Sequence, residues 1–140
     1  MAYATSNTDF LKRAGNYNIG KQLLDEEITL SQFMDTSVDN LASGSYYKIF
    51  AVPANFALLD AFVICHTAEG ATGTVDIVDD DSATTTFVND ANVNSAGAVG
   101  ATAARKLYTS AGFIVILPNN ALDTAKFEVV IRGKLIKTTD

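Results

Sequence analysis

At 140 residues, the chain has the length of one domain and is long enough to bury a hydrophobic core. Hydrophobic residues make up 48% of it and charged residues only 19%, which excludes a disordered acidic chain. The net charge of −6 argues against nucleic-acid binding, which needs a surplus of Lys and Arg, and the single cysteine excludes an intramolecular disulfide.

Neither end of the chain nor its middle carries a membrane or export signal. No apolar run reaches the roughly 18 residues that a membrane helix needs, and the opening MAYATSNTDFLKR lacks the apolar core of a signal peptide. We therefore expect no membrane partner and a protein that folds where it is made.

Residues 1–40 are polar, with scattered apolar side chains, and are predicted to form an N-terminal arm or linker ahead of a domain at 41–140. The stretch LLDEEITLSQFM fits a helix in part, but EITL within it fits a strand of the domain equally well. Two interpretations stay open for the segment: a loose terminus, or an extended arm that becomes ordered on a partner. Its candidate partner contacts are its isolated apolar residues: Phe10, Ile19, Leu23, Leu24, Ile28 and Phe33.

From Tyr46 onwards the pattern favours strands. YYKIFAVP ends at Pro53, and FALLDAFVICHT is apolar on both faces, as in a strand that is buried on both sides or meets a partner. We assign Phe56, Leu58, Phe62 and Ile64 to one face and Leu59, Val63 and Cys65 to the other. After the turn AEGATG comes TVDIV, which we expect to form an antiparallel hairpin with FALLDAFVICHT.

The second half of the chain predicts more strands. Residues 82–104 are rich in Ala, Thr, Asn and Gly and predict loops with short, irregular strands. KLY and FIVIL are short strands, and KFEVVIRGKLI alternates, with Phe127, Val129, Ile131 and Leu135 on its apolar face. Many short strands with Gly, Pro and Asn turns indicate an all-β sandwich or barrel.

The residues that commonly carry catalysis are sparse. His66 is the only histidine and follows a hydrophobic strand, so we interpret it as structural or incidental. Its neighbour Cys65 should face the opposite side of that strand and serve as a small buried hydrophobe. Zinc needs several Cys or His ligands, and no nucleophile elbow or phosphate-binding loop is present. The chain is therefore predicted not to be an enzyme and to use no cofactor.

The stretch DIVDDDS is the one acidic cluster. Asp79, Asp80 and Asp81 are weak candidates for metal ligands, because three carboxylates in a row offer the oxygen atoms that Ca²⁺ prefers. The spacing of an EF-hand is absent. The simpler interpretation is a strand end where charge and turn propensity stop the ladder.

The segment AVPANFALLDAFVICHTAEGATGTVDIV, with Phe87 and Val88 after the acidic loop, resembles small jelly-roll proteins of tailed-bacteriophage heads. Val52, Pro53 and Ala54 take the place of an I-P-A strand end, and residues 67–70 take the turn. The resemblance covers roughly residues 46–135 and departs at Asp79–Ser82, where the usual Pro and Gly are missing.

The resemblance implies a jelly-roll-like antiparallel β-sandwich with an extended N-terminal arm, acting as a head decoration (cement) protein. Such a protein would be made in the host cytoplasm, lie on the outer capsid surface of the virion, bind the major capsid protein and bridge capsomers as a homotrimer. The alternatives are a phage fibre, tail or receptor-binding module and a small carbohydrate-binding domain, although the absence of Trp weakens the last.

Overall fold

The computed structural model describes residues 27–80 and 85–136, and over these residues the chain forms strands and no helix. The strands are β1 Glu27–Asp35, β2 Tyr47–Val52, β3 Phe56–Thr67, β4 Thr74–Asp79, β5 Thr86–Asn92, β6 Val99–Gly100, β7 Lys106–Tyr108, β8 Gly112–Pro118 and β9 Lys126–Leu135.

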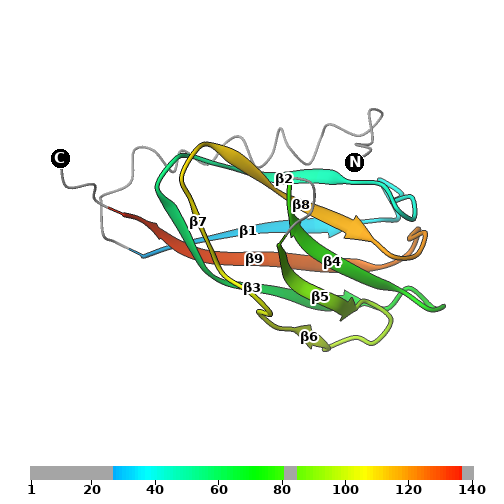
Figure 1. Ribbon diagram of the computed structural model, residues 1–140. Helices are drawn as coiled ribbons and strands as arrows, with labels where there is room; N and C mark the ends of the chain where they lie inside the picture. The colour runs from blue at the N-terminus through cyan, green and yellow to red at the C-terminus, as the bar shows by residue number, and fades with distance from the viewer. Residues whose placement is uncertain (1–26, 81–84, 137–140) are drawn as a thin grey trace.

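Two antiparallel sheets pack face to face (Figure 1). The first sheet has the order β1-β9-β3-β6, with β7 also paired to β3, and the second has the order β2-β8-β4-β5. Strand β1 pairs with β9, β2 with β8, β3 with β6 and β4 with β5, so the first half of the chain runs beside the second half in reverse order. This connectivity is that of a jelly roll, and the predicted all-β sandwich is confirmed.

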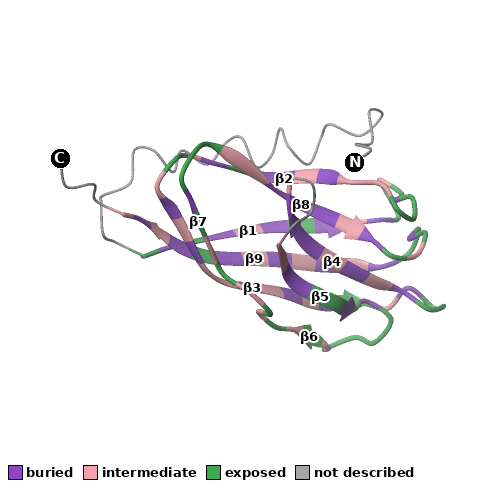
Figure 2. Cartoon of the chain, viewed as in Figure 1, coloured by how far each residue is buried: buried purple, intermediate pink, exposed green. Residues whose placement is uncertain are grey.

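The core lies between the sheets and draws on both. Figure 2 shows buried residues along the strands and exposed ones in the turns. In β9 the alternation predicted from the sequence is confirmed, since the four apolar residues assigned to one face are all buried. The largest fully buried side chains of the core include Phe50, Phe56, Phe87, Phe127 and Met34.

Strand β1 lies inside the segment 1–40 that the sequence assigned to the arm. It pairs with β9 along its whole length, from Glu27 opposite Lys134 to Asp35 opposite Lys126. Ile28, Leu30 and Met34 point into the core. The strand alternative for EITL is therefore the one that the structure has, and the sandwich includes residues from Glu27 onwards.

The predicted hairpin of FALLDAFVICHT with TVDIV is wrong. These segments are β3 and β4, and they lie in different sheets: β3 pairs with β6, β7 and β9, and β4 pairs with β5 and β8. The six-residue connection between them is long enough to cross from one sheet to the other. Its Glu69 N–H bonds the Val93 carbonyl oxygen, which lies just beyond β5, at 3.0 Å.

The predicted faces of β3 also need correction. Phe56 and Leu58 point into the core as expected, but beyond them the inward residues are Ala61, Val63 and Cys65. The cause is an irregularity between Leu58 and Asp60, where an extra residue reverses the alternation. Phe62 and Ile64 therefore point to the outer face and are only partly buried.

The segment 82–104 contains more strand than its composition predicted. Its residues 82–84 lie outside the described part of the chain. Strand β5 has seven residues and buries Phe87, Val88 and Ala91, whereas β6 has two residues, in keeping with the expected short strands.

Gly133, near the end of β9, allows the two central strands of the first sheet to approach closely. A Cβ at this position would lie 2.3 Å from the Ala57 carbonyl oxygen and 2.5 Å from the Phe56 ring. No larger residue fits there without moving β3, so this glycine is required by close packing.

Candidate functional site

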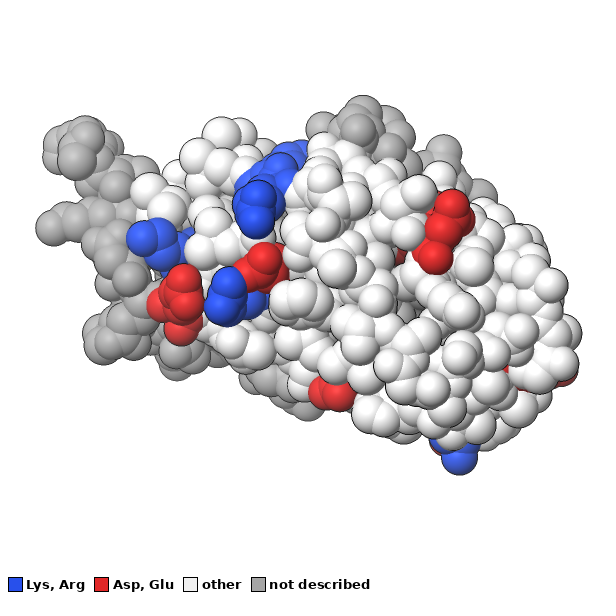
Figure 3. All heavy atoms as spheres, turned by 90° about the horizontal axis from the view of Figure 1, so that it is seen from below, with Lys and Arg blue, Asp and Glu red and all other residues white. Residues whose placement is uncertain are grey.

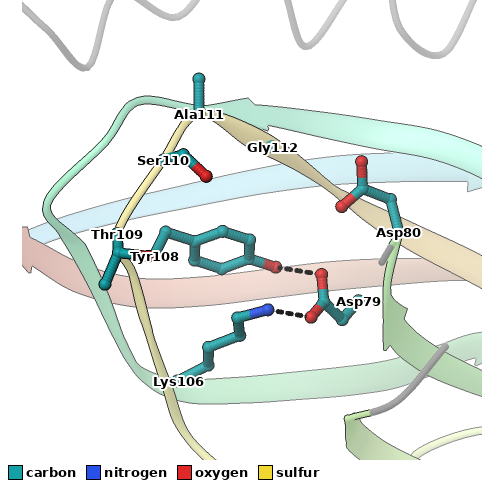
Figure 4. A pocket seen from close by; sticks show the side chains of 8 residues that line it. All are labelled: Asp79, Asp80, Lys106, Tyr108, Thr109, Ser110, Ala111 and Gly112. Atoms are coloured by element: carbon teal, nitrogen blue, oxygen red, sulfur yellow. Dashed lines mark hydrogen bonds and ion pairs between the residues drawn. The ribbon is translucent and has the colours of Figure 1, made fainter. Parts of the chain in front are cut away.

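The acidic stretch borders a hollow of about 370 Å³ at one end of the sandwich (Figure 4). The end of β4, strand β7 and the turn into β8 supply its walls. The lining residues are Asp79, Asp80, Lys106, Tyr108, Thr109, Ser110, Ala111 and Gly112. Two of the three candidate metal ligands line this hollow, which makes it the candidate site for binding or catalysis.

Asp79 is the last residue of β4, and its side chain is completely buried. One carboxylate oxygen forms an ion pair with the Lys106 ammonium group, and the other accepts a hydrogen bond of 3.4 Å from the Tyr108 hydroxyl (Figure 4). The Lys106 nitrogen also lies 4.8 Å from the centre of the Tyr108 ring. Asp79 therefore ties β4 to β7 across the end of the sandwich.

The electrostatics of this cluster favour a structural role over acid–base chemistry. Burial and, after it, the negative charges of Asp79 and Asp80 raise the pKa of Tyr108 far above its usual value, so the phenol stays protonated and donates to Asp79. A base near neutral pH would need a pKa close to 7. Tyr108 does not supply one, and the Asp79 carboxylate is already paired with Lys106.

Asp80 lies at the rim of the hollow. Burial, followed by the neighbouring Asp79 carboxylate, raises the pKa of its side chain, while its hydrogen bond with Phe113 and the charge of Lys48 act in the opposite direction. Asp81 lies outside the described residues. Within residues 27–80 and 85–136, no three His, Cys, Asp or Glu side chains gather closely enough to hold a metal ion.

A carboxyl group whose pKa is raised by folding weakens the fold when it is ionised, because the native state binds the proton more tightly than the unfolded state does. We therefore expect Asp80→Asn to leave the free energy of unfolding at pH 7 unchanged or to raise it by up to about 0.5 kcal/mol. The penalty for ionising Asp80 builds up between its ordinary pKa in the unfolded chain and its raised pKa in the folded chain. The difference from wild type should therefore vanish once the pH falls below the ordinary value. Denaturant unfolding at several pH values measures both effects.

Thermal unfolding with and without Ca²⁺ tests the cation alternative for Asp79, Asp80 and Asp81. We expect Ca²⁺ to leave the melting temperature of the wild type, of Asp80→Asn and of Asp81→Asn unchanged. A large rise in the wild type that is abolished in both variants would instead establish a cation site.

Cys65 and His66 lie as the sequence predicts, on opposite sides of β3. The Cys65 thiol is buried, donates to the Thr67 carbonyl oxygen over 3.5 Å, and has its pKa raised by burial. The His66 ring is half exposed, with Nε2 3.5 Å from a Glu128 carboxylate oxygen and its centre 5.8 Å from that of the Phe33 ring. Neither side chain meets the hollow.

Two of the six predicted partner contacts, Ile28 and Phe33, lie within the described residues. Phe10, Ile19, Leu23 and Leu24 lie outside the described residues. Ile28 packs in the core and is therefore not available to a partner in the folded chain. Phe33 is 48% exposed on the outer face of β1, which makes it the one predicted contact that is described and accessible.

The role of Glu69 could not be predicted from the sequence. Its buried carboxylate accepts three backbone hydrogen bonds from the loop between β8 and β9: from Asp123 at 2.8 Å, from Thr124 at 3.0 Å and from Ala125 at 2.6 Å. The β3–β4 connection is thereby fixed to the start of β9. A lone Glu in a turn carries no sign of such partners, since the donors lie more than 50 residues further along the chain.

Comparison with solved structures finds the same fold in three bacteriophage capsid structures. A chain of the acidic stable capsid structure of Helicobacter pylori bacteriophage KHP30 matches with a TM-score of 0.63 and 12% identity, covering 82% of this chain and 92% of that one. A chain of the capsid of Ralstonia phage GP4 has a TM-score of 0.60, 14% identity and coverage of 84% and 89%. A chain of the cyanophage Pam1 capsid asymmetric unit has a TM-score of 0.54, 16% identity and coverage of 85% and 97%.

At these identities the matches establish a shared fold along most of each chain. No family model matches the sequence, and no curated protein matches it. The described residues contain no helix with the length and apolar composition needed to cross a bilayer.

Proposed function

We propose that this chain is a structural protein of a phage virion, most specifically a head decoration or cement protein that binds the outer capsid surface and bridges capsomers. The observation that carries the proposal is the jelly roll itself, since chains of three phage capsid structures share it over nearly their whole length. The partner is the major capsid protein, and the chain acts as a homotrimer.

The acidic hollow supports a role without catalysis. Its most buried carboxylate, Asp79, is held by Lys106 and Tyr108, and Tyr108 stays protonated. Such a cluster fixes one end of the sandwich and leaves no activated nucleophile. A protein that must stay folded on a particle surface benefits from this kind of tie between strands.

We further propose that the arm comprises the residues ahead of Glu27 and contributes to attachment. Its polar composition and its four isolated apolar residues, Phe10, Ile19, Leu23 and Leu24, suit a segment that docks onto a neighbour. Ordering such a segment costs roughly 1–2 kcal/mol of backbone entropy per residue, so several of these side chains must act together.

Deletion of residues 2–20 should leave the sandwich folded and weaken binding to heads. The reason is that β1 begins at Glu27, so the deletion removes no described strand. Circular dichroism measures the fold, and co-sedimentation with purified heads that lack the protein measures attachment. A full-length variant with Phe10 and Ile19 replaced by Ser keeps the length of the chain and removes only two apolar side chains. If these side chains make the contact, binding of this variant should also fall.

Two outcomes of this deletion would contradict the role of the arm. If the truncated protein unfolds, the arm belongs to the core. If binding to heads is unchanged, the arm is a loose terminus. Failure of the wild-type protein itself to sediment with heads would argue against the cement role as a whole.

A further inference from the structure

The outer face of the first sheet carries a row of large side chains that the core does not use. Phe33 of β1, Glu128 of β9, Ile64 of β3 and Val99 of β6 lie directly opposite one another in register across the four strands. Phe33 is 48% exposed and Val99 is 59% exposed. Residues opposite one another on neighbouring strands share a face, so the row is a continuous strip across the sheet.

A second row beside it extends the apolar area. Val130 of β9 lies opposite Phe62 of β3, and both are only partly buried. Together, Phe33, Phe62, Ile64, Val99 and Val130 form what we call the outer apolar strip. Exposed apolar patches of this kind mark interaction sites more often than single exposed residues do.

Charged side chains frame the strip at both ends, and they are already paired within the chain. At one end Lys126 Nζ lies 3.7 Å from Asp35. Glu128, which lies within the first row, is 3.5 Å from His66 Nε2. At the other end Arg132 forms an ion pair with Asp60, which Arg105 also approaches at 4.0 Å. An apolar centre with a polar rim is the usual anatomy of a protein–protein interface.

The charge of this face indicates which partner it fits. Four basic and four acidic side chains lie on this face or at its border: Lys126, Arg132, Lys134 and Arg105 with Glu27, Asp35, Asp60 and Glu128. The formal charge of the face is therefore zero, whereas the whole chain carries −6. The other described residues contain two lysines against seven carboxylates. Figure 3, seen from below the view of Figure 1, shows basic and acidic side chains gathered together on one part of the surface.

Copies of an acidic chain repel one another wherever their excess carboxylates meet. The neutral, apolar face is the described surface on which two copies approach without that repulsion. We propose that the outer face of the first sheet is a self-association surface, which packs against a second copy of this chain through the outer apolar strip. The inference names the contact surface within the proposed homotrimer and rests on the proposed function only for the number of copies.

The test is the molar mass of the isolated protein by sedimentation equilibrium, for wild type, Phe33→Asp and Val99→Asp. Both replaced residues are exposed, so the charge should not disturb the core. Truncating one of the few hot-spot side chains of an interface costs a factor of about 30 or more in affinity. We expect Phe33 and Val99 to be such residues, so each variant should raise the dissociation constant at least about 30-fold. Val38→Asp, which adds the same charge at a residue 75% exposed outside the strip, is the matched control and should associate like wild type.

Ionic strength provides a second readout. Because the strip is apolar and its rim charges are paired, salt should mainly screen the repulsion between the acidic remainders of the two copies. Association of the wild type should therefore strengthen between low and moderate salt. Contact through complementary charges would weaken instead.

Several outcomes would overturn the inference. A wild type that stays monomeric at tens of micromolar, or strip variants that associate as tightly as wild type while circular dichroism shows them folded, would each do so.

If the strip variants lose binding to heads but keep the wild-type mass, the face contacts the capsid protein and the inference fails. If the wild type associates through the strip but does not bind heads, the self-association surface stands and the cement role fails.

Discussion

Replacing Asp79 by Ala should lower the free energy of unfolding by roughly 3 kcal/mol, the low end of the range for breaking a buried ion pair. The substitution leaves the Lys106 ammonium group without its carboxylate at a site where the lysine side chain is only 26% exposed. It also removes an acceptor of the Tyr108 hydroxyl, which is buried. Urea denaturation of wild type and variant gives the difference directly.

Two further variants separate this effect from a general sensitivity of the acidic stretch. Asp80→Asn, one residue away at the rim of the hollow, is the matched control and should stay within about 0.5 kcal/mol of wild type. The double variant Asp79→Asn with Lys106→Met should recover much of the loss, because it removes both charges together. A loss below about 1 kcal/mol for Asp79→Ala would mean that the ion pair does not hold this end of the sandwich.

Replacing Glu69 by Ala should be similarly destabilising, by roughly 3 kcal/mol. Three backbone N–H groups lose a charged acceptor, and each buried donor that stays without a partner costs about 1–3 kcal/mol. The total stays near the cost of one or two donors because the loop at residues 123–125 can shift toward water. Glu69→Gln should lie between Ala and wild type, since its amide keeps one acceptor oxygen but turns an N–H₂ group toward the remaining donors.

The control for Glu69 is Asp123→Asn in the same loop. The Asp123 side chain accepts an exposed hydrogen bond of 3.0 Å from the Thr124 hydroxyl, so this contact stays within the loop. We expect a change within about 0.5 kcal/mol for this variant. Equal stability of Glu69→Ala and wild type would show that the loop does not depend on the carboxylate for its place beside β9.

Strands with simple alternation could be predicted from the sequence, and β9 is the best example. Strand β1 was harder to recognise because Gln32, a polar residue, occupies an inward position and is 5% exposed, while Phe33 beside it points outward. That exchange breaks the polar–apolar alternation on which recognition of a strand depends. In β5, irregular pairing with β4 lets the adjacent Phe87 and Val88 both be buried, which has the same effect.

The pairing of strands could not be predicted, because it depends on contacts between residues far apart in the chain. The residues between β3 and β4 have the composition of a hairpin turn. In the jelly roll, however, these two strands lie in different sheets. The resemblance to phage head proteins implied a jelly-roll-like sandwich but left the order of its strands open.

Two of the residues that line the acidic hollow, Asp79 and Asp80, were singled out from the sequence, but their partners were not. Their acidic stretch was interpreted as the end of a strand and not as a reaction centre. The sequence did not predict that Asp79 would be completely buried, because its partners Lys106 and Tyr108 come from β7, 27 and 29 residues further on. Ion pairs between separate strands leave no spacing pattern in the sequence.

The proposed place of this protein on the virion can be tested most directly by electron cryo-microscopy of particles with and without it. We predict added density on the outer surface of the head, where neighbouring capsomers meet, into which the two-sheet sandwich fits. That density should disappear from particles assembled without the protein. Density confined to the tail or to fibres, or particles that are identical with and without the protein, would contradict the account.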